Sequence, residues 1–126
     1  MIFGIGTDIF EVKRMKERIE KEPSFIHGIF TAKEISYCNQ FKNKAERLAA
    51  RYAAKESFLK ALGTGWRNGI SFDEIEILND SLGKPDIHLT GTAKQIISDL
   101  KIESIHVSIS HIKDLAIAFV IINNNN

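Results

Sequence analysis

The sequence lacks the features that define several classes of protein. It contains a single cysteine, Cys38, so it forms neither an internal disulfide nor a metal cluster held by cysteines. The longest apolar run, residues 115–122, is far too short to cross a bilayer. Met1 leads straight into an apolar stretch ending at Asp8, without the basic segment and small-residue cleavage site of a secretory leader. We therefore expect a soluble, cytoplasmic protein with no membrane partner.

An excess of charge of one sign is also missing. The 17 lysines and arginines almost balance the 16 aspartates and glutamates, and a net charge of +1 argues against a nucleic-acid partner. The charge is nevertheless uneven, because residues 11–60 hold 12 basic and 7 acidic residues while the remainder holds 5 and 9. This asymmetry indicates either a face that meets an acidic partner or ordinary solvated helix faces.

Apolar residues are abundant enough to form a packed core. They make up 44% of the 126 residues, and this length is typical of one domain. Alternating bulky and small residues predict a strand over 2–9, with Asp8 placed to cap the helix that follows. That helix is expected from Glu11 to about Lys21, and Pro23 ends it.

Two more helices are expected in the first half of the chain. Thr31 and Glu34 have the spacing of a capping box and predict a helix that reaches about Phe41. Residues 45–62 predict the longest helix, since they are rich in good helix formers. Its apolar stripe consists of Leu48, Tyr52, Leu59 and Leu62.

The second half of the chain is predicted to be rich in strands. Residues 74–78 and 86–89 alternate and form a hairpin, and a short helix is expected from Thr90 or Gly91 to about Leu100. Strands follow over 104–110 and 115–122, the latter apolar enough for burial on both faces. The order β-ααα-ββ-α-ββ predicts a single α+β domain over 1–122, with helices packed on one largely antiparallel sheet, and a polar, frayed tail over 123–126.

Two acidic side chains are candidates for a metal site. Asp8 ends the first strand and Glu56 lies within the long helix, and carboxylates from two elements suit Mg²⁺, which often keeps substrate phosphates in its shell. From spacing alone, a helix cap is the favoured role for Asp8, and a pair with Lys60, four residues on, is the favoured role for Glu56. Beside a metal-bound phosphate, Lys60 would neutralise charge as a phosphoryl bond breaks.

Two polar segments are weaker candidates for a site. Gly63, Thr64 and Gly65 follow the long helix, which favours a C-cap over a phosphate-binding loop, because such a loop precedes its helix. Ser110 and His111 end a strand, where neighbouring side chains point apart, and no nucleophile-elbow sequence is present. Phosphate binding by this pair is therefore favoured over a serine nucleophile.

Five segments, in order and spacing, resemble the holo-[acyl-carrier-protein] synthase family, the small bacterial type of 4′-phosphopantetheinyl transferase. The resemblance runs from Met1 to about Ile122, and its most specific part is residues 51–65. Tyr52 departs from the family's usual Phe or Trp. The other four segments are Gly4-Ile5-Gly6-Thr7-Asp8-Ile9 with Glu11-Val12-Lys13-Arg14, Phe30-Thr31 with Glu34, Asn79 with Gly83-Lys84-Pro85, and Ser108-Ile109-Ser110-His111 with Ala116-Ile117-Ala118.

This resemblance implies a fold and a reaction. The 4′-phosphopantetheine arm of coenzyme A would pass to a serine of apo acyl carrier protein, with release of adenosine 3′,5′-bisphosphate, in fatty acid biosynthesis. Asp8 and Glu56 would hold Mg²⁺ against the coenzyme A pyrophosphate, with Lys60 beside it, and either Glu56 or a metal-bound water would accept the serine proton. The residues that the resemblance places around the nucleotide are Arg51, Gly63, Thr64, Gly65, Ser110 and His111.

The resemblance also implies a homotrimer with active sites between subunits, and docking of the acidic carrier protein on the first helix. Two other functions stay open: a non-catalytic module that holds an acidic partner, and a transferase that serves carrier domains of polyketide or peptide synthetases. Two acids meeting at one place would favour an enzyme over a pure binder. The candidate docking residues are Lys13, Arg14, Arg18, Lys21 and Phe25.

Overall fold

A computed structural model describes residues 1–63 and 69–125 of the chain. Among the helices described, none is long and apolar enough to span a membrane. The elements in chain order are β1 (Ile2–Glu11), α1 (Val12–Lys21), α2 (Phe25–Ile29), α3 (Ala32–Cys38), α4 (Lys44–Leu62), the 3₁₀ turn η2 (Phe72–Glu74), β2 (Ile75–Asn79), β3 (Pro85–Leu89), α5 (Gly91–Asp99), β4 (Ile102–His111) and β5 (Leu115–Asn124). The predicted α+β class is confirmed.

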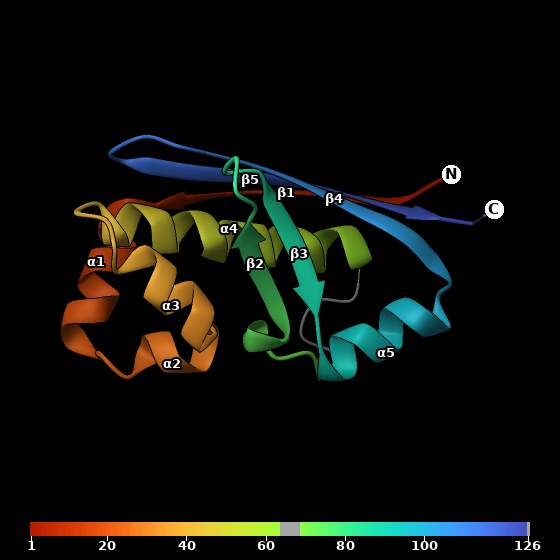
Figure 1. Ribbon diagram of the computed structural model, residues 1–126, viewed down its shortest axis with the longest axis horizontal. Coiled ribbons are helices and arrows are strands. Elements are labelled where there is room, and N and C mark those ends of the chain that lie inside the picture. The colour runs from red at the N-terminus through yellow and green to blue at the C-terminus, as the bar shows by residue number, and fades with distance from the viewer. Residues whose placement is uncertain (64–68, 126) are drawn as a thin grey trace.

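The strands form two antiparallel sheets instead of the single sheet that we expected. One sheet has the order β1-β5-β4, and the other consists of β2 and β3. In the larger sheet Asp8 lies opposite Ala118, which in turn lies opposite Ile109. The hairpin was correctly expected, but it forms a sheet of its own, which passes α4 and packs beside β4 of the larger sheet (Figure 1).

Helix α4 is the centre of the molecule. It lies along one face of the β1-β5-β4 sheet, α1, α2 and α3 lie on its other side, and the hairpin crosses it and reaches β4 (Figure 1). Its small residues, such as Ala53 and Ala54, are fully buried, and so are large ones such as Leu48 and Phe58. A helix covered on most of its circumference needs little polar surface, which explains how this helix accommodates so many alanines.

Two glycines of β1 set the distance between the sheet and α4. Gly4, Gly6 and Asp8 alternate along the strand, so their side-chain positions share the face that meets α4. A Cβ atom at Gly4 would overlap the carbonyl oxygen of Ala61, and one at Gly6 would overlap that of Ser57. Only glycine therefore lets the strand approach the helix this closely, and the same approach brings Asp8 to the helix surface.

The first half of the chain departs from prediction in three places. Asp8 lies inside β1 and does not cap α1, whose N-cap is Glu11 without a side-chain hydrogen bond. Helix α3 ends at Cys38, earlier than the expected Phe41, although its capping box is present as expected. Helix α2 was not predicted at all, because one and a half turns are too short to show a helical period.

Strand β5 is buried on one face only, which corrects the expectation of burial on both. Ala116, Ala118, Val120 and Ile122 face α4 and are buried, whereas the residues between them are exposed or, at Ile121, half-buried. The strand also continues through Asn124, so the first two tail residues pair with the sheet instead of fraying. Together with β1 it leaves the outer face of the sheet apolar, with exposed side chains at Ile5, Ile9, Leu115, Ile117 and Phe119.

A fully buried ion pair connects α4 to the elements on its far side. Lys55 Nζ donates to Glu34 Oε1 at 2.8 Å, to the Phe72 carbonyl at 2.9 Å and to the Ile75 carbonyl at 2.7 Å. Glu34 also accepts from the backbone of Ile77 at 2.9 Å. Burial lowers the pKa of Lys55, and the charge of Glu34 opposes that shift. Every proton of the ammonium is used, so this pair fixes η2 and β2 against α4.

Candidate functional site

The first group of predicted residues meets where β1 crosses α4. Lys60 Nζ lies 3.0 Å from Asp8 Oδ1 and 3.0 Å from the Thr7 carbonyl oxygen. Lys60 therefore connects β1 to α4, and it does not form the ion pair with Glu56 that their spacing within the helix allowed. Two of its three protons are used, which leaves one for a ligand. The Lys60 side chain is 54% exposed, so this remaining donor is accessible.

Glu56 lies one turn before Lys60 on the same side of α4. Burial raises the pKa of its carboxyl, and the negative charge of Asp8 raises it further, while a hydrogen bond with Tyr52 and the charge of Lys60 act in the opposite direction. Burial, and then the charge of Glu56, raises the pKa of Tyr52 to about 12. The structure thus brings Asp8, Glu56 and Lys60 together, as the sequence predicted.

The carboxylates of Asp8 and Glu56 suit a hard divalent cation that is completed by a substrate. In the described residues, no group of three histidine, cysteine or acidic side chains is arranged to hold a metal alone. Mg²⁺ commonly binds through one or two protein carboxylates plus phosphate oxygens and water. The donor set is therefore compatible with Mg²⁺ bound together with a phosphate, and it does not form an all-protein cage.

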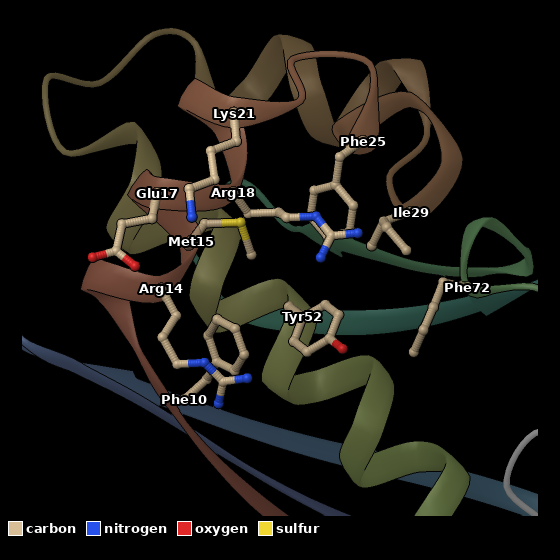
Figure 2. A pocket seen from close by; sticks show the side chains of 10 residues that line it. All are labelled: Phe10, Arg14, Met15, Glu17, Arg18, Lys21, Phe25, Ile29, Tyr52 and Phe72. Carbon is tan, nitrogen blue, oxygen red and sulfur yellow. The ribbon is translucent and has the colours of Figure 1, made fainter.

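A cavity of about 420 Å³ opens beside this group, between α1 and α4. Figure 2 shows Arg14 and Arg18 reaching toward its middle, around the Tyr52 ring. The Arg14 guanidinium lies 5.1 Å from the centre of the Phe10 ring, and that of Arg18 lies 4.5 Å from the Phe25 ring. Lys21 also lines the cavity. Because Tyr52 contacts both the cavity and Glu56, the cavity leads to the carboxylate pair.

Four of the five predicted docking residues line this cavity, and the fifth lies elsewhere. Arg14, Arg18, Lys21 and Phe25 are among the lining residues. Lys13 instead lines a separate cavity of about 290 Å³, with Lys16 and Lys113 among its neighbours. Residues 13 and 14 are about 100° apart around the helix axis, so they face different directions.

A further cavity, of about 210 Å³, lies between α3, α4 and the hairpin. Arg51, which is 4% exposed, donates from Nη2 to Asn79 Oδ1, and its guanidinium lies 4.6 Å from the centre of the Tyr37 ring. Within the part of the chain that the structure describes, Arg51 Nε is buried without a hydrogen-bond partner. Arg47 and His111 add positive or ionisable groups to the lining. This cavity therefore suits an anion.

Two other residues that the resemblance places around the nucleotide, Gly63 and Ser110, do not line that cavity. Ser110 and His111 are neighbours on β4 and point to opposite faces, so Ser110 lies on the exposed outer face of the sheet. Gly63 caps α4 in the left-handed conformation, with a φ of 84°, and its N–H donates to the helix. Thr64 and Gly65 lie outside the described residues.

Sequence reasoning missed three contributors to these surfaces. Tyr52 was assigned to the apolar stripe, although its hydroxyl contacts Glu56. Glu46 pairs with His111 across 65 positions of sequence, at 2.6 Å between Oε1 and Nδ1. Lys55, next to Glu56, is consumed by its buried pair with Glu34. Only Tyr52 gave a signal in the sequence, since the family usually has Phe or Trp at this position. The other two contributors form pairs between residues that are distant in sequence, so no signal in the sequence pointed to them.

Comparisons with known proteins agree with this arrangement. The family model of the 4′-phosphopantetheinyl transferase superfamily matches residues 4–120. A holo-[acyl-carrier-protein] synthase from Clostridium novyi is 48% identical over 126 residues, which is 100% of this chain and 91% of the relative. The crystal structure of holo-[acyl-carrier-protein] synthase from Neisseria meningitidis is 37% identical with a TM-score of 0.91, covering 98% of this chain and 100% of that one. The Helicobacter pylori enzyme in complex with coenzyme A is 30% identical with a TM-score of 0.84, covering 94% and 99%.

Proposed function

The chain belongs to the 4′-phosphopantetheinyl transferase superfamily, and on that basis we propose that it transfers the 4′-phosphopantetheine group of coenzyme A to a serine of apo acyl carrier protein. It is a transferase of the holo-[acyl-carrier-protein] synthase type. The single observation that carries the proposed mechanism is the meeting of Asp8, Glu56 and Lys60 where β1 crosses α4. The second product would be adenosine 3′,5′-bisphosphate. We expect the reaction to take place in the cytoplasm and to serve fatty acid synthesis.

The reaction requires charge neutralisation more than covalent catalysis by the protein. The serine oxygen of the carrier attacks the β-phosphorus of coenzyme A, and the bond from that phosphorus to the bridging oxygen breaks. The negative charge that develops on the leaving phosphate lies within reach of the remaining Lys60 proton, which can stabilise or protonate it. Glu56, whose pKa is raised by burial, is one candidate to accept the serine proton.

Asp8 and Glu56 would hold a Mg²⁺ ion against the pyrophosphate. The mutual repulsion of the two carboxylates, which raises the pKa of Glu56, is relieved when a cation lies between them. When bound, Mg²⁺ supplies positive charge to the phosphate oxygens and orients them. The protein fixes this geometry through Gly4 and Gly6, which allow β1 to approach α4 closely.

The nucleotide end of coenzyme A requires a second copy of the chain. Arg51 and Glu56 are five residues apart on α4, or about 140° around its axis, so their side chains leave opposite flanks of a helix about 10–12 Å across. The pyrophosphate and the 3′-phosphate of coenzyme A are attached to one ribose and do not reach around such a helix. We therefore propose that Lys60 of one subunit and Arg51 with His111 of its neighbour contact the same molecule.

The apolar outer face of the β1-β5-β4 sheet supports a homo-oligomer. Ile9, Ile117 and Phe119 are 60%, 44% and 43% exposed on this face, and no element of the described chain covers it (Figure 1). A contiguous exposed apolar surface of this kind commonly marks an interface with another protein chain. Ser110 lies on the same face and would be buried by the neighbour. The trimeric state is the one that the family resemblance implies.

The cavity beside α1 would receive the carrier protein. Arg14, Arg18 and Lys21 present positive charge around an apolar floor made by Phe25 and Tyr52 (Figure 2). Acidic helices of a carrier would pair with the cations, while an apolar side chain enters between them. Since Tyr52 lies between this cavity and Glu56, a docked carrier would present its serine toward the carboxylates.

The direct test is incubation with coenzyme A, Mg²⁺ and apo acyl carrier protein, followed by intact-mass measurement of the carrier. A mass gain of one phosphopantetheine is expected, and it should disappear in Asp8→Asn and Glu56→Gln. An unchanged carrier mass, with the carrier still bound, would favour the non-catalytic module instead. A carrier domain from a polyketide or peptide synthetase, tested in parallel, separates the third possibility.

A further inference from the structure

His111 lines the Arg51 cavity, and its partner Glu46, which lies outside that lining, has no role in the mechanism described so far. Glu46 Oε1 is 2.6 Å from His111 Nδ1, and their side chains are only 16% and 26% exposed. The hydrogen bond with His111 is the main reason why the pKa of Glu46 lies below its usual range. An ionised carboxylate only accepts hydrogen bonds, so Nδ1 carries the hydrogen, and Nε2 is the ring nitrogen left for a ligand.

His111 shares its cavity with Arg47 and Arg51, and Arg51 Nε is buried there without a partner in the described part of the chain. A phosphate monoester in this cavity would face two guanidinium groups and one imidazole. With a phosphate on one side and Glu46 on the other, the ring lies between two anions, and a ring nitrogen that carries a hydrogen can donate to the anion it faces. Without the carboxylate, the ring loses the hydrogen bond that fixes its orientation and is free to rotate away from the phosphate.

We infer that Glu46 is a positioning residue that holds His111 as a donor to the 3′-phosphate of the nucleotide, and so makes the site select nucleotides that carry this phosphate. The inference rests on the proposed function for the identity of the ligand. The role inferred for Glu46 does not require that the protein catalyses transfer, because the preference for nucleotides with a 3′-phosphate is a property of binding. Glu46 does not contact the ligand itself; it acts through His111.

Isothermal titration of the full-length protein with two probes tests this role. The probes are adenosine 3′,5′-bisphosphate and adenosine 5′-monophosphate, which differ only in the 3′-phosphate. A charge-assisted hydrogen bond is worth on the order of a tenfold change in affinity or more. Glu46→Gln should therefore reduce the preference for the bisphosphate about tenfold, with the affinity for the monophosphate unchanged. Glu20→Gln, the same change at an exposed position of α1, is the matched control and should keep the preference.

A double-mutant cycle separates positioning from general damage to the fold. If Glu46 acts only through His111, the variant carrying both Glu46→Gln and His111→Gln should lose no more preference than His111→Gln alone. Additive losses, or an equal loss of affinity for both probes in Glu46→Gln, would overturn the inference. Kinetics with coenzyme A and 3′-dephospho-coenzyme A as substrates give a second measurement. In Glu46→Gln, the kcat/KM for coenzyme A divided by that for the dephospho form should fall, because the KM for coenzyme A rises while kcat is unchanged.

This design distinguishes the inference from the proposed function. If the protein prefers the bisphosphate and loses that preference in Glu46→Gln but transfers nothing to a carrier, the positioning role stands and the proposed reaction fails. If transfer is normal and the preference is unaffected by Glu46→Gln, the proposed reaction stands and the positioning role fails.

Discussion

Replacing Lys55 with methionine removes one half of the buried pair that connects α4 to η2, β2 and α3. The methionine fills a similar volume, so the change tests charge and hydrogen bonding more than packing. Glu34 would stay fully buried without a cation, and the carbonyl groups of Phe72 and Ile75 would each lose a donor at 2.9 and 2.7 Å. All three protons of that ammonium are used in these contacts, so the variant removes three hydrogen bonds together with the charge.

Removing one partner of a buried ion pair reduces the free energy of unfolding by about 3–5 kcal/mol. With a urea m value near 2 kcal/mol/M, this corresponds to a fall in the unfolding midpoint of roughly 2 M. The double variant Glu34→Gln with Lys55→Met should be less destabilised than Lys55→Met, since it leaves no uncompensated charge.

Urea unfolding followed by circular dichroism, at one fixed subunit concentration, measures both variants, because an oligomer's apparent stability depends on concentration. Lys94→Met, at an exposed position of α5, is the matched control and should change the free energy of unfolding by about 0.5 kcal/mol or less. A loss below about 1 kcal/mol in Lys55→Met, or strict additivity in the double variant, would refute the argument from burial.

Three further predictions concern the surfaces of the molecule. Arg14→Glu should weaken carrier binding about tenfold or more while leaving the affinity for coenzyme A unchanged. Lys13→Glu, a change at a residue that lines another cavity, should weaken carrier binding less. Calorimetry with both ligands measures these affinities, and an equal fall in both would indicate a folding defect. Phe119→Glu should convert the oligomer to monomers with unchanged circular dichroism, and an unchanged mass by light scattering contradicts the proposed interface. Because the pKa of Glu46 is lowered below 4.5 by folding, the unfolded chain takes up that proton first as the pH falls, so this stabilisation is present above pH 4.5 and is lost below it. The urea midpoint of Glu46→Gln should therefore fall less steeply below pH 4.5 than that of the unchanged chain, and identical slopes would contradict the pairing.

Most elements of the fold follow from local sequence, and the departures have physical causes. Strong period and capping signals predicted α3 and α4, but five-residue α2 carries no period. The β2–β3 hairpin is local and was predicted, but whether it joins the larger sheet or stays separate depends on contacts that are distant in sequence. The apolar character of β5 was misread as burial on both faces, because an apolar run does not reveal which of its residues the rest of the chain covers.

Some features of the candidate site could be predicted from the sequence and others could not. Residue type and element order left the convergence of Asp8 and Glu56 as one of two possibilities, and the resemblance favoured it and placed Lys60 beside them; the structure brings the three residues together. The partners that decide which charges remain for ligands were not predictable. Lys55 is next to Glu56 in sequence but forms its ion pair with Glu34. The pairing of His111 with Glu46 depends on how β4 lies against α4.

In the proposed site, Lys60 of one copy and the Arg51 cavity of its neighbour act on the same molecule of coenzyme A. Two inactive chains test it: Lys60→Ala, and a chain carrying Arg51→Gln with His111→Gln. Each alone should transfer almost no phosphopantetheine to the carrier. Mixed by unfolding and refolding in equal amounts, they should regain about a quarter of the unchanged activity, because one site in four then combines two intact halves. No regain, with mixed oligomers demonstrated by native mass spectrometry, would contradict a site shared between copies.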